Sequence, residues 1–262
     1  MTGALVVARR ELTGLFMAPF TWIVLLVVLL FNGLLFNTFL LNSGGNVSAT
    51  LESSMSGIGF WVWMVFLPAL LSMRLIAEES RNGTLEYLLT APVGDLAVVV
   101  GKFLAATFFL GIVWTSALVY AGTLQWVGGS PDWPAVIGTW IGTLLVSGLF
   151  VSIGMLASTF TATPLLAAFL SMVACVLWLV LPWLVMRGLS YVLPFIADTG
   201  DRQEVIVDRV TGIVASMDAV RHFQRSFMVG VFDTAEVIFF ATWTGLFLFL
   251  TARSLEARRW RG

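Results

Sequence analysis

Residues 59–95 read "GFWVWMVFLPALLSMRLIAEESRNGTLEYLLTAPVGD", an apolar run followed by a short, densely charged stretch. A second apolar run, "VVVGKFLAATFFLGIVWTSALVYAG" at residues 98–122, comes directly after it. A helix needs about 20 mainly apolar residues to cross the core of a bilayer. Taken with the residues that flank them, both runs reach that length. The charged stretch, residues 74–95, is therefore predicted to connect two membrane spans on one side of a bilayer.

The composition of the whole chain supports a membrane protein. Of its 262 residues, 59% are hydrophobic and 11% are charged, and the mean hydropathy is +0.95. Soluble domains carry about 25% charged residues. The net charge of -1 argues against nucleic acid as a partner. The single cysteine, Cys175, excludes a disulfide framework within the chain.

Apolar runs along the chain predict one all-α membrane domain, residues 1–262, with six transmembrane helices. The predicted spans are 18–41, 58–77, 101–127, 134–158, 163–186 and 235–253. The N-terminal residues 1–17 lack the features of a signal peptide and are predicted to form an amphipathic helix along the membrane face. The polar, glycine-rich stretch "NSGGNVSATLESSMS" at 42–56 is predicted to be a loop. Pro68 and Pro182 fall inside spans, where proline tends to kink a helix.

Basic residues set the predicted orientation, because Lys and Arg concentrate on the cytoplasmic side. One side carries the larger set: Arg9, Arg10, Arg74, Arg81, Lys102, Arg253, Arg258, Arg259 and Arg261. The other carries Arg187, Arg202, Arg209, Arg221 and Arg225, with most of the acidic residues. Both termini and residues 74–95 are therefore predicted to be cytoplasmic, which places the long segment 187–234 outside.

The fourth span is rich in small residues that allow helices to approach closely. They are Gly138, Gly142, Gly148 and Gly154. They fit either helix packing within the subunit or an interface between subunits. The spans contain almost no ionisable groups, which disfavours an intramembrane enzyme or an ion-coupled carrier. The one histidine, His222, has no HExxH motif around it, so it is predicted to be a surface residue and no metal site is expected.

The outer segment 187–234 contains a periodic apolar stripe, which predicts an amphipathic helix within 203–230. Its members are Ile206, Val210, Ile213, Met217, Val220, Phe223 and Phe227. Such a helix caps the spans, lies in the lipid interface or docks a partner. The sequence favours capping without excluding the other two.

The charged stretch 74–95 is predicted to form two short cytoplasmic helices. Glu78 and Glu79 lie near the start of the first, Gly83 interrupts the run, and Thr84 can cap the second. Three leucines form an apolar patch at helical spacing, and Pro92 ends it. They are Leu85, Leu88 and Leu89. From periodicity alone, a docking element and an ordinary solvated loop both remain open.

Residues 74–92, "RLIAEESRNGTLEYLLTAP", resemble the cytoplasmic segment between the second and third spans of ABC-2 type transporter permeases. The branch most similar is that of the gliding-motility and copper-processing permeases. "RRELTGLFMAPFTWI" at 9–23 and "HFQRSFMVGVFDTAEVIFFATWTGLFLFLTARSLEARRW" at 222–260 resemble that branch as well. Two departures bear on the branch. Ser80 displaces the usual basic residue to Arg81, and Arg221 with His222 replaces a more aromatic run.

The resemblance implies a six-span half-transporter in which a cytoplasmic coupling helix contacts a separate ABC ATPase subunit. The chain has no GxxxxGK[ST] phosphate loop, so it is not expected to be an enzyme or to hold a cofactor. ATP and Mg are expected on the partner ATPase. The coupling contacts implied are Glu78, Glu79, Arg81, Gly83, Thr84, Leu85, Glu86, Leu88, Leu89 and Pro92. The interfacial helix, with Arg9, Arg10 and Glu11, is expected to move with them.

The expected function is that of the permease subunit of an ATP-driven exporter in the inner membrane of a bacterial cell. A second copy, or a related permease, is expected to complete the membrane body. Lipid contacts and an outer accessory protein are further expected partners. The alternative is a membrane anchor or mechanotransmission scaffold that acts on an envelope assembly through segment 187–234 without classical transport. The sequence does not indicate a substrate.

Overall fold

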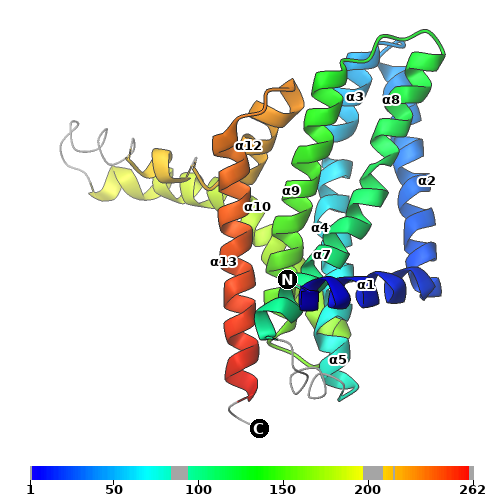
Figure 1. The fold of residues 1–262 in the computed structure, drawn as a ribbon. Helices are drawn as coiled ribbons and strands as arrows, with labels where there is room; N and C mark the ends of the chain where they lie inside the picture. Colours follow the sequence, from blue (N-terminus) through cyan, green and yellow to red (C-terminus); the bar gives the residue numbers. More distant parts are fainter. Residues whose placement is uncertain (1, 84–93, 197–208, 215, 260–262) are drawn as a thin grey trace.

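The computed structural model describes residues 2–83, 94–196, 209–214 and 216–259, and these form helices without strands (Figure 1). The helices that run along the bundle are α2 (Pro19–Asn42), α4 (Ile58–Leu75), α7 (Asp95–Trp114), α8 (Ser116–Trp126), α9 (Trp133–Ser158), α10 (Pro164–Ile196) and α13 (Thr234–Arg259). The others are α1 (Thr2–Met17), α3 (Val47–Ser56), α5 (Ala77–Arg81), α12 (Ala219–Ser226) and the 3-10 turn η1 (Phe227–Val229).

Among the described residues, six helical stretches are long and apolar enough to cross a membrane, so the prediction of an all-α integral membrane protein is confirmed. The stretch formed by α9 is the most enclosed, with 72% of its apolar window buried, against 6% for α2. Helices α4, α7, α10 and α13 all pack against α9. The bundle is therefore built around α9, and α2 stands at its edge (Figure 1).

Residues 42–56, predicted to be a loop, instead contain helix α3. The side chain of Asn46 caps it by accepting a hydrogen bond from the Ala49 N–H at 3.1 Å. Leu51 of α3 is buried in a small cluster with Ala121 and Val136. The stretch looks polar in sequence, but a capped helix that buries one apolar edge against its neighbours is stable there.

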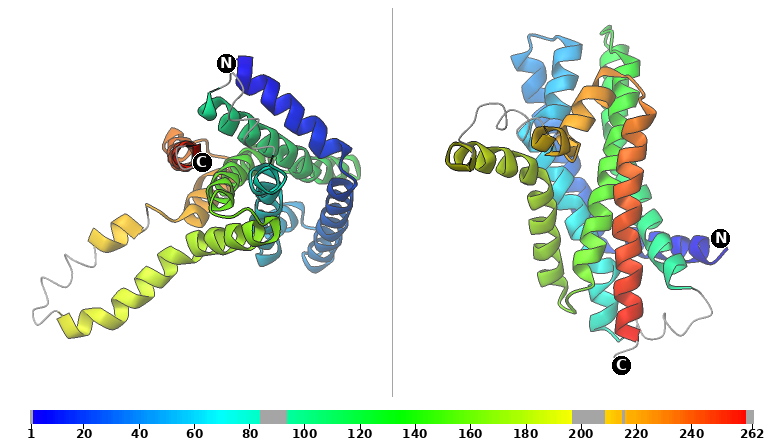
Figure 2. Two further views of the ribbon diagram at one scale, coloured as in Figure 1. Left: turned by 90° about the horizontal axis from the view of Figure 1, so that it is seen from below. Right: turned by 90° about the vertical axis from the view of Figure 1, so that its left-hand side faces the viewer.

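Two spans differ in their limits from the prediction. The third begins at Asp95 rather than 101 and is interrupted at Thr115, whose hydroxyl donates to the Gly111 carbonyl at 2.8 Å. The fifth, α10, continues past residue 186 to Ile196. Its second half leaves the bundle and runs sideways (Figure 2). Pro182 lies within this helix, and proline is a usual cause of such a change in direction.

The outer segment is not the single helix predicted for 203–230. Asp218 begins a new helix there, because its carboxylate accepts hydrogen bonds from the Val220 and Arg221 N–H groups at 3.0 and 3.1 Å. The apolar residues of the predicted stripe also differ in burial. Phe223 and Phe227 are fully buried, whereas the Ile213 side chain is 63% exposed. Ile206 lies outside the described residues.

Phe223 and Phe227 pack against Gly138 and Gly142 in the N-terminal half of α9. A Cβ atom on Gly142 would lie 2.7 Å from Phe227 Cβ and 3.0 Å from Phe223 Cδ2, and one on Gly138 would lie 2.5 Å from the Phe227 carbonyl oxygen. Only glycine allows an approach this close. We call these four residues the outer seat. It joins α12 and η1 to α9 within one chain.

The other two glycines of α9 also face helices of the same chain. A Cβ atom on Gly148 would lie 3.3 Å from the ring of Phe103 on α7. Gly154 faces Ser72 on α4, whose hydroxyl oxygen would lie 2.3 Å from such an atom. All four predicted packing glycines therefore make contacts within the subunit.

His222, predicted to be a surface residue, is instead partly buried between α12 and α13. Its Nδ1 contacts the carboxylate of Glu236, and its ring stacks on Phe239 with the centroids 4.1 Å apart. The side chain is 21% exposed. The sequence does not reveal this pairing, because His222 and Glu236 lie on different helices.

Cys175 lies on α10 where that helix packs against α9. The side chain is fully buried. Its Sγ donates a weak hydrogen bond to the Phe150 carbonyl at 3.7 Å. The residue therefore packs as a small apolar side chain with one polar contact.

Candidate functional site

The predicted coupling stretch begins at the end of α4 and continues into the short helix α5, at the end of the bundle that carries α1 and the C-terminus (Figure 1). We call this the inner end. Arg74 Nε donates to Glu78 Oε2 at 3.0 Å, which ties α4 to α5. The Ala77 N–H donates to Ser158 Oγ at 3.0 Å, which ties α5 to the end of α9. Gly83, with φ of +69°, then turns the chain in a way that favours glycine.

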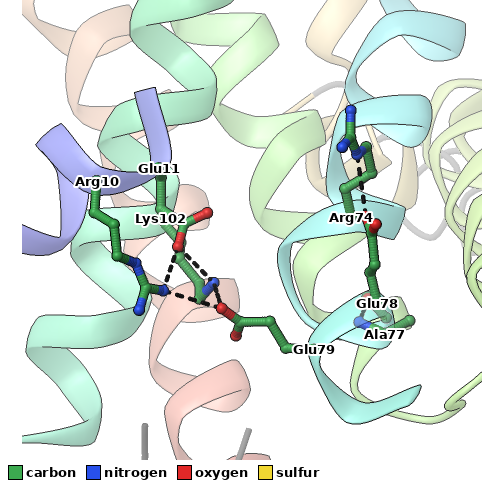
Figure 3. Close-up of polar contacts among 8 residues, drawn as sticks. Arg10, Glu11, Arg74, Ala77, Glu78, Glu79 and Lys102 are labelled. Carbon is green, nitrogen blue, oxygen red and sulfur yellow. Dashed lines mark hydrogen bonds and ion pairs between the residues drawn. The ribbon is translucent and has the colours of Figure 1, made fainter. Parts of the chain in front are cut away.

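Four charged side chains from three helices meet beside α5 (Figure 3). Arg10 Nη2 of α1 lies 2.6 Å from Glu11 Oε1 and 3.0 Å from Glu79 Oε1. Lys102 Nζ of α7 lies 3.1 Å from Glu11 Oε1 and 2.8 Å from Glu79 Oε1. Each carboxylate thus contacts both cations. We call this group the inner ionic cluster.

The cluster is largely shielded from solvent. The side chain of Lys102 is 2% exposed, and those of Glu11 and Glu79 are each 17% exposed, whereas Arg10 is 53% exposed. A lysine is almost never buried unless it is paired. Two positive and two negative charges balance here, so removing any one of them leaves an uncompensated charge in a poorly solvated place.

The two charges on α1 stabilise each other. Burial by itself raises the pKa of Glu11, but the charge of Lys102 and the hydrogen bonds from Arg10 and Lys102 outweigh burial and lower that pKa below its ordinary value. The hydrogen bond to Glu11 raises the pKa of Arg10, against the opposing effect of its own desolvation. Both groups are therefore charged at neutral pH.

A glycine lets α1 approach α7 closely enough to form the cluster. A Cβ atom on Gly101 would lie 2.7 Å from the Ala4 carbonyl oxygen and 2.8 Å from Val7 Cβ. Lys102 is the next residue along α7. The close contact at Gly101 thus brings the lysine within reach of Glu11 on α1.

The structure brings together some of the predicted site residues and separates others. Arg10, Glu11 and Glu79 form the cluster, and Glu78 pairs with Arg74. Arg9 and Arg81 are exposed and belong to neither group. The remaining predicted contacts lie outside the described residues: Thr84, Leu85, Glu86, Leu88, Leu89 and Pro92.

Lys102 completes the inner ionic cluster, although the sequence pattern does not single it out as a candidate site residue. Lys102 is the single lysine of the chain. A lone lysine near the start of an apolar helix requires a partner, and this was the signal available. Across the described ranges, no three His, Cys, Asp or Glu side chains gather in a way that could hold a metal ion.

Comparison with known proteins agrees with this architecture. The model of the ABC-2 family transporter protein family matches residues 5–251. No curated protein matches the chain. The family match covers all six apolar helical stretches except the last residues of α13. The chain therefore belongs to the ABC-2 family of transporter proteins, and it is a multi-pass permease of the ABC transporter type.

Proposed function

We propose that this chain is the permease subunit of an ATP-driven exporter whose ATP is hydrolysed, with Mg, by a separate ATPase subunit. In this proposal the ATPase docks on the predicted coupling segment 78–95 from the cytoplasm. A second copy, or a related permease, completes the membrane body in the inner membrane of a bacterial cell. The inner ionic cluster is the observation that carries the proposal.

The cluster supports the proposal because it joins α5 to the helices of the bundle. Helix α5 is joined to α4 through Arg74, to α9 through Ser158, and to α1 and α7 through Glu79. Pulling apart a buried and balanced ionic group costs several kcal/mol, of the order of 3–5 kcal/mol when one partner is lost. A force applied to α5 is therefore passed to four helices instead of being absorbed by a loop.

A continuous series of contacts leads from α5 to the opposite end of the molecule. Ser158 and the outer seat lie at the two ends of α9. A shift of α9 caused by α5 would therefore alter the seat of Phe223 and Phe227. Adjacent contacts alone do not establish energetic coupling, so the experiment must measure it.

Docking is tested with charge-reversal variants of the full chain co-expressed with its ATPase. Glu78→Arg and Leu88→Arg are expected to abolish co-purification of the ATPase and stimulation of its activity by the permease. Glu52→Arg, a matched reversal on α3 at the other end of the bundle, is expected to leave both unchanged. Normal complex formation by Glu78→Arg and Leu88→Arg would show that the ATPase docks elsewhere.

The transmission of movement from α5 to the helices of the bundle is tested separately with Glu79→Gln. This variant removes the charge of Glu79 from the cluster but leaves Glu78 and the leucine patch intact. We expect the complex to form while permease-stimulated ATP hydrolysis falls by about 10-fold or more, because the loss of 1.4 kcal/mol corresponds to a factor of 10. Unchanged stimulation would mean that the cluster serves stability alone.

A further inference from the structure

Helix α1 presents three different strips around its exposed side. Successive residues of an α-helix turn by about 100°. Leu5, Leu12 and Phe16 therefore share one apolar strip, in which Leu5 is 64% exposed and Leu12 and Phe16 are partly buried against the core. Arg10 lies on the opposite margin, where it reaches Glu79. Arg9 lies between the two strips, on the outermost face of the helix.

The apolar strip and Arg9 border one shallow groove of about 520 Å³. Its lining is Leu5, Ala8, Arg9, Leu12, Thr13, Phe16 and Met17. No carboxylate among the described residues pairs with Arg9, whereas the neighbouring Arg10 contacts two. The groove thus combines an apolar floor with an available guanidinium.

Helix α1 lies across the direction of the spans and joins α2 at its end (Figures 1 and 2). Trp22, in the first turn of α2, lies beside this joint. Trp22 Nε1 donates to the Phe16 carbonyl at 2.7 Å, and the Trp22 side chain is 55% exposed. Tryptophan is enriched at the level of the lipid head groups. The joint therefore marks where the membrane surface meets the protein, and α1 lies at that level.

We propose that this groove binds an anionic phospholipid of the inner leaflet. The Arg9 guanidinium holds the phosphate, for which its paired N–H groups are well suited. The acyl chain lies along Leu5, Leu12 and Phe16 and continues beside the exposed face of α2, where Ile23 is 62% exposed. The lipid would fix α1 to the membrane surface while Arg10 and Glu11 fix it to α5 and α7. This inference does not depend on ATP coupling.

A lipid fits this face better than the ATPase does. The side of α1 nearest α5 carries Arg10, whose charge the cluster already balances. The groove lies on the other side of the helix, next to the apolar surface of α2, and its one charge is positive. A positive charge beside an apolar strip at head-group level complements an anionic phospholipid.

The full chain, purified and reconstituted in nanodiscs of mixed phosphatidylglycerol and phosphatidylcholine, tests the proposal. The measurement is the enrichment of phosphatidylglycerol among lipids that stay bound in native mass spectrometry. Arg9→Gln is expected to lower that enrichment by about five-fold, the effect of one basic residue near the membrane surface. Arg253→Gln is the matched control, because that exposed cation is on α13 and already pairs with Glu256. It is expected to have no effect.

Three results would overturn the proposal. The first is equal enrichment of phosphatidylglycerol by wild type and Arg9→Gln, and a simultaneous loss of ATPase co-purification in Arg9→Gln would identify a protein contact instead. The second is an equal loss of enrichment in Arg253→Gln. The third is displacement of phosphatidylglycerol by excess inorganic phosphate, which would reduce the groove to a simple anion site. Retention of phosphatidylglycerol in the presence of that phosphate supports a lipid site.

Discussion

The inner ionic cluster and the outer seat solve the same structural problem with opposite chemistry. Each fixes a helix that does not span the membrane onto the spanning bundle. At the inner end, Lys102 and Glu79 hold α1 and α5 through charge. At the outer end, Gly142 and Phe227 hold α12 and η1 through close apolar contact.

The difference lies in what each attachment tolerates. An ionic cluster acts over several ångströms and can follow a small movement of its helices, but it depends on every charge being present. A glycine and an aromatic ring in contact hold only one relative position, because dispersion forces fall off within about 1 Å. The inner end is therefore suited to transmit displacement, and the outer end is suited to hold one arrangement until it is released.

The largest effect is expected from Lys102→Met. This change leaves Glu11 and Glu79 buried with Arg10 as the remaining cation of the cluster. We expect the free energy of unfolding to fall by about 3–5 kcal/mol, the usual result of leaving a buried charge unpaired. Thermal unfolding of the purified chain in detergent measures it. The double variant Lys102→Met/Glu79→Gln should regain part of the loss, and a single variant as stable as wild type would contradict a structural role for the cluster.

Gly142→Ala is the matching change at the outer seat. The added methyl group would lie 2.7 Å from Phe227 Cβ, an atom that cannot move without its backbone. We expect a loss of about 1–3 kcal/mol from overpacking, despite the better helix propensity of alanine. Gly122→Ala on α8 is the control, because nothing lies within 4 Å of its added atom. It should be neutral or slightly stabilising, and the same result for Gly142 would rule out the seat.

A smaller effect is expected from His222→Phe, which keeps the stacking on Phe239 but removes the contact with Glu236. The free energy of unfolding should fall by about 1–2 kcal/mol, because the largely buried carboxylate of Glu236 loses its hydrogen-bond partner. Protease accessibility of the outer segment should rise in parallel. If Glu236→Gln has the same effect and the double variant adds nothing, the two residues act as one pair.

Acidification should weaken the inner end through Glu11. Because the folded state lowers the pKa of Glu11, its contribution to stability is present above the ordinary value of 4.5 and is lost as the pH falls through the lower folded value. Unfolding measured below pH 4.5 should therefore be less pH-dependent in Glu11→Gln than in wild type. An identical pH dependence of the two proteins would show that Glu11 is not stabilised in this way.

The spans could be predicted because their apolar runs are longer than any soluble core requires. The first and last residues of a helix were harder to predict where a single polar side chain caps the helix. Asn46 starts α3 inside an apparent loop, and Asp218 starts α12 inside an apparent continuous helix. Ser, Asn and Asp can cap a helix or sit in a turn, and local sequence does not distinguish the two.

The site was predictable residue by residue but not as an arrangement. Arg10, Glu11 and Glu79 were singled out from the family resemblance, whereas their meeting point depends on Lys102. That lysine reaches them only because Gly101 lets α1 and α7 approach closely. Contacts between residues so distant in sequence depend on tertiary packing, which no local pattern specifies.

The buried thiol of Cys175 has a practical consequence. It is the only sulfhydryl group of the chain, and it faces the interior between α9 and α10, out of reach of water-soluble maleimides. Water-soluble maleimides are therefore not expected to label the unmodified chain. A single cysteine introduced at Arg81 or at Gln224 would be the only labelled position, so each end of the molecule can carry its own spectroscopic reporter during a turnover cycle.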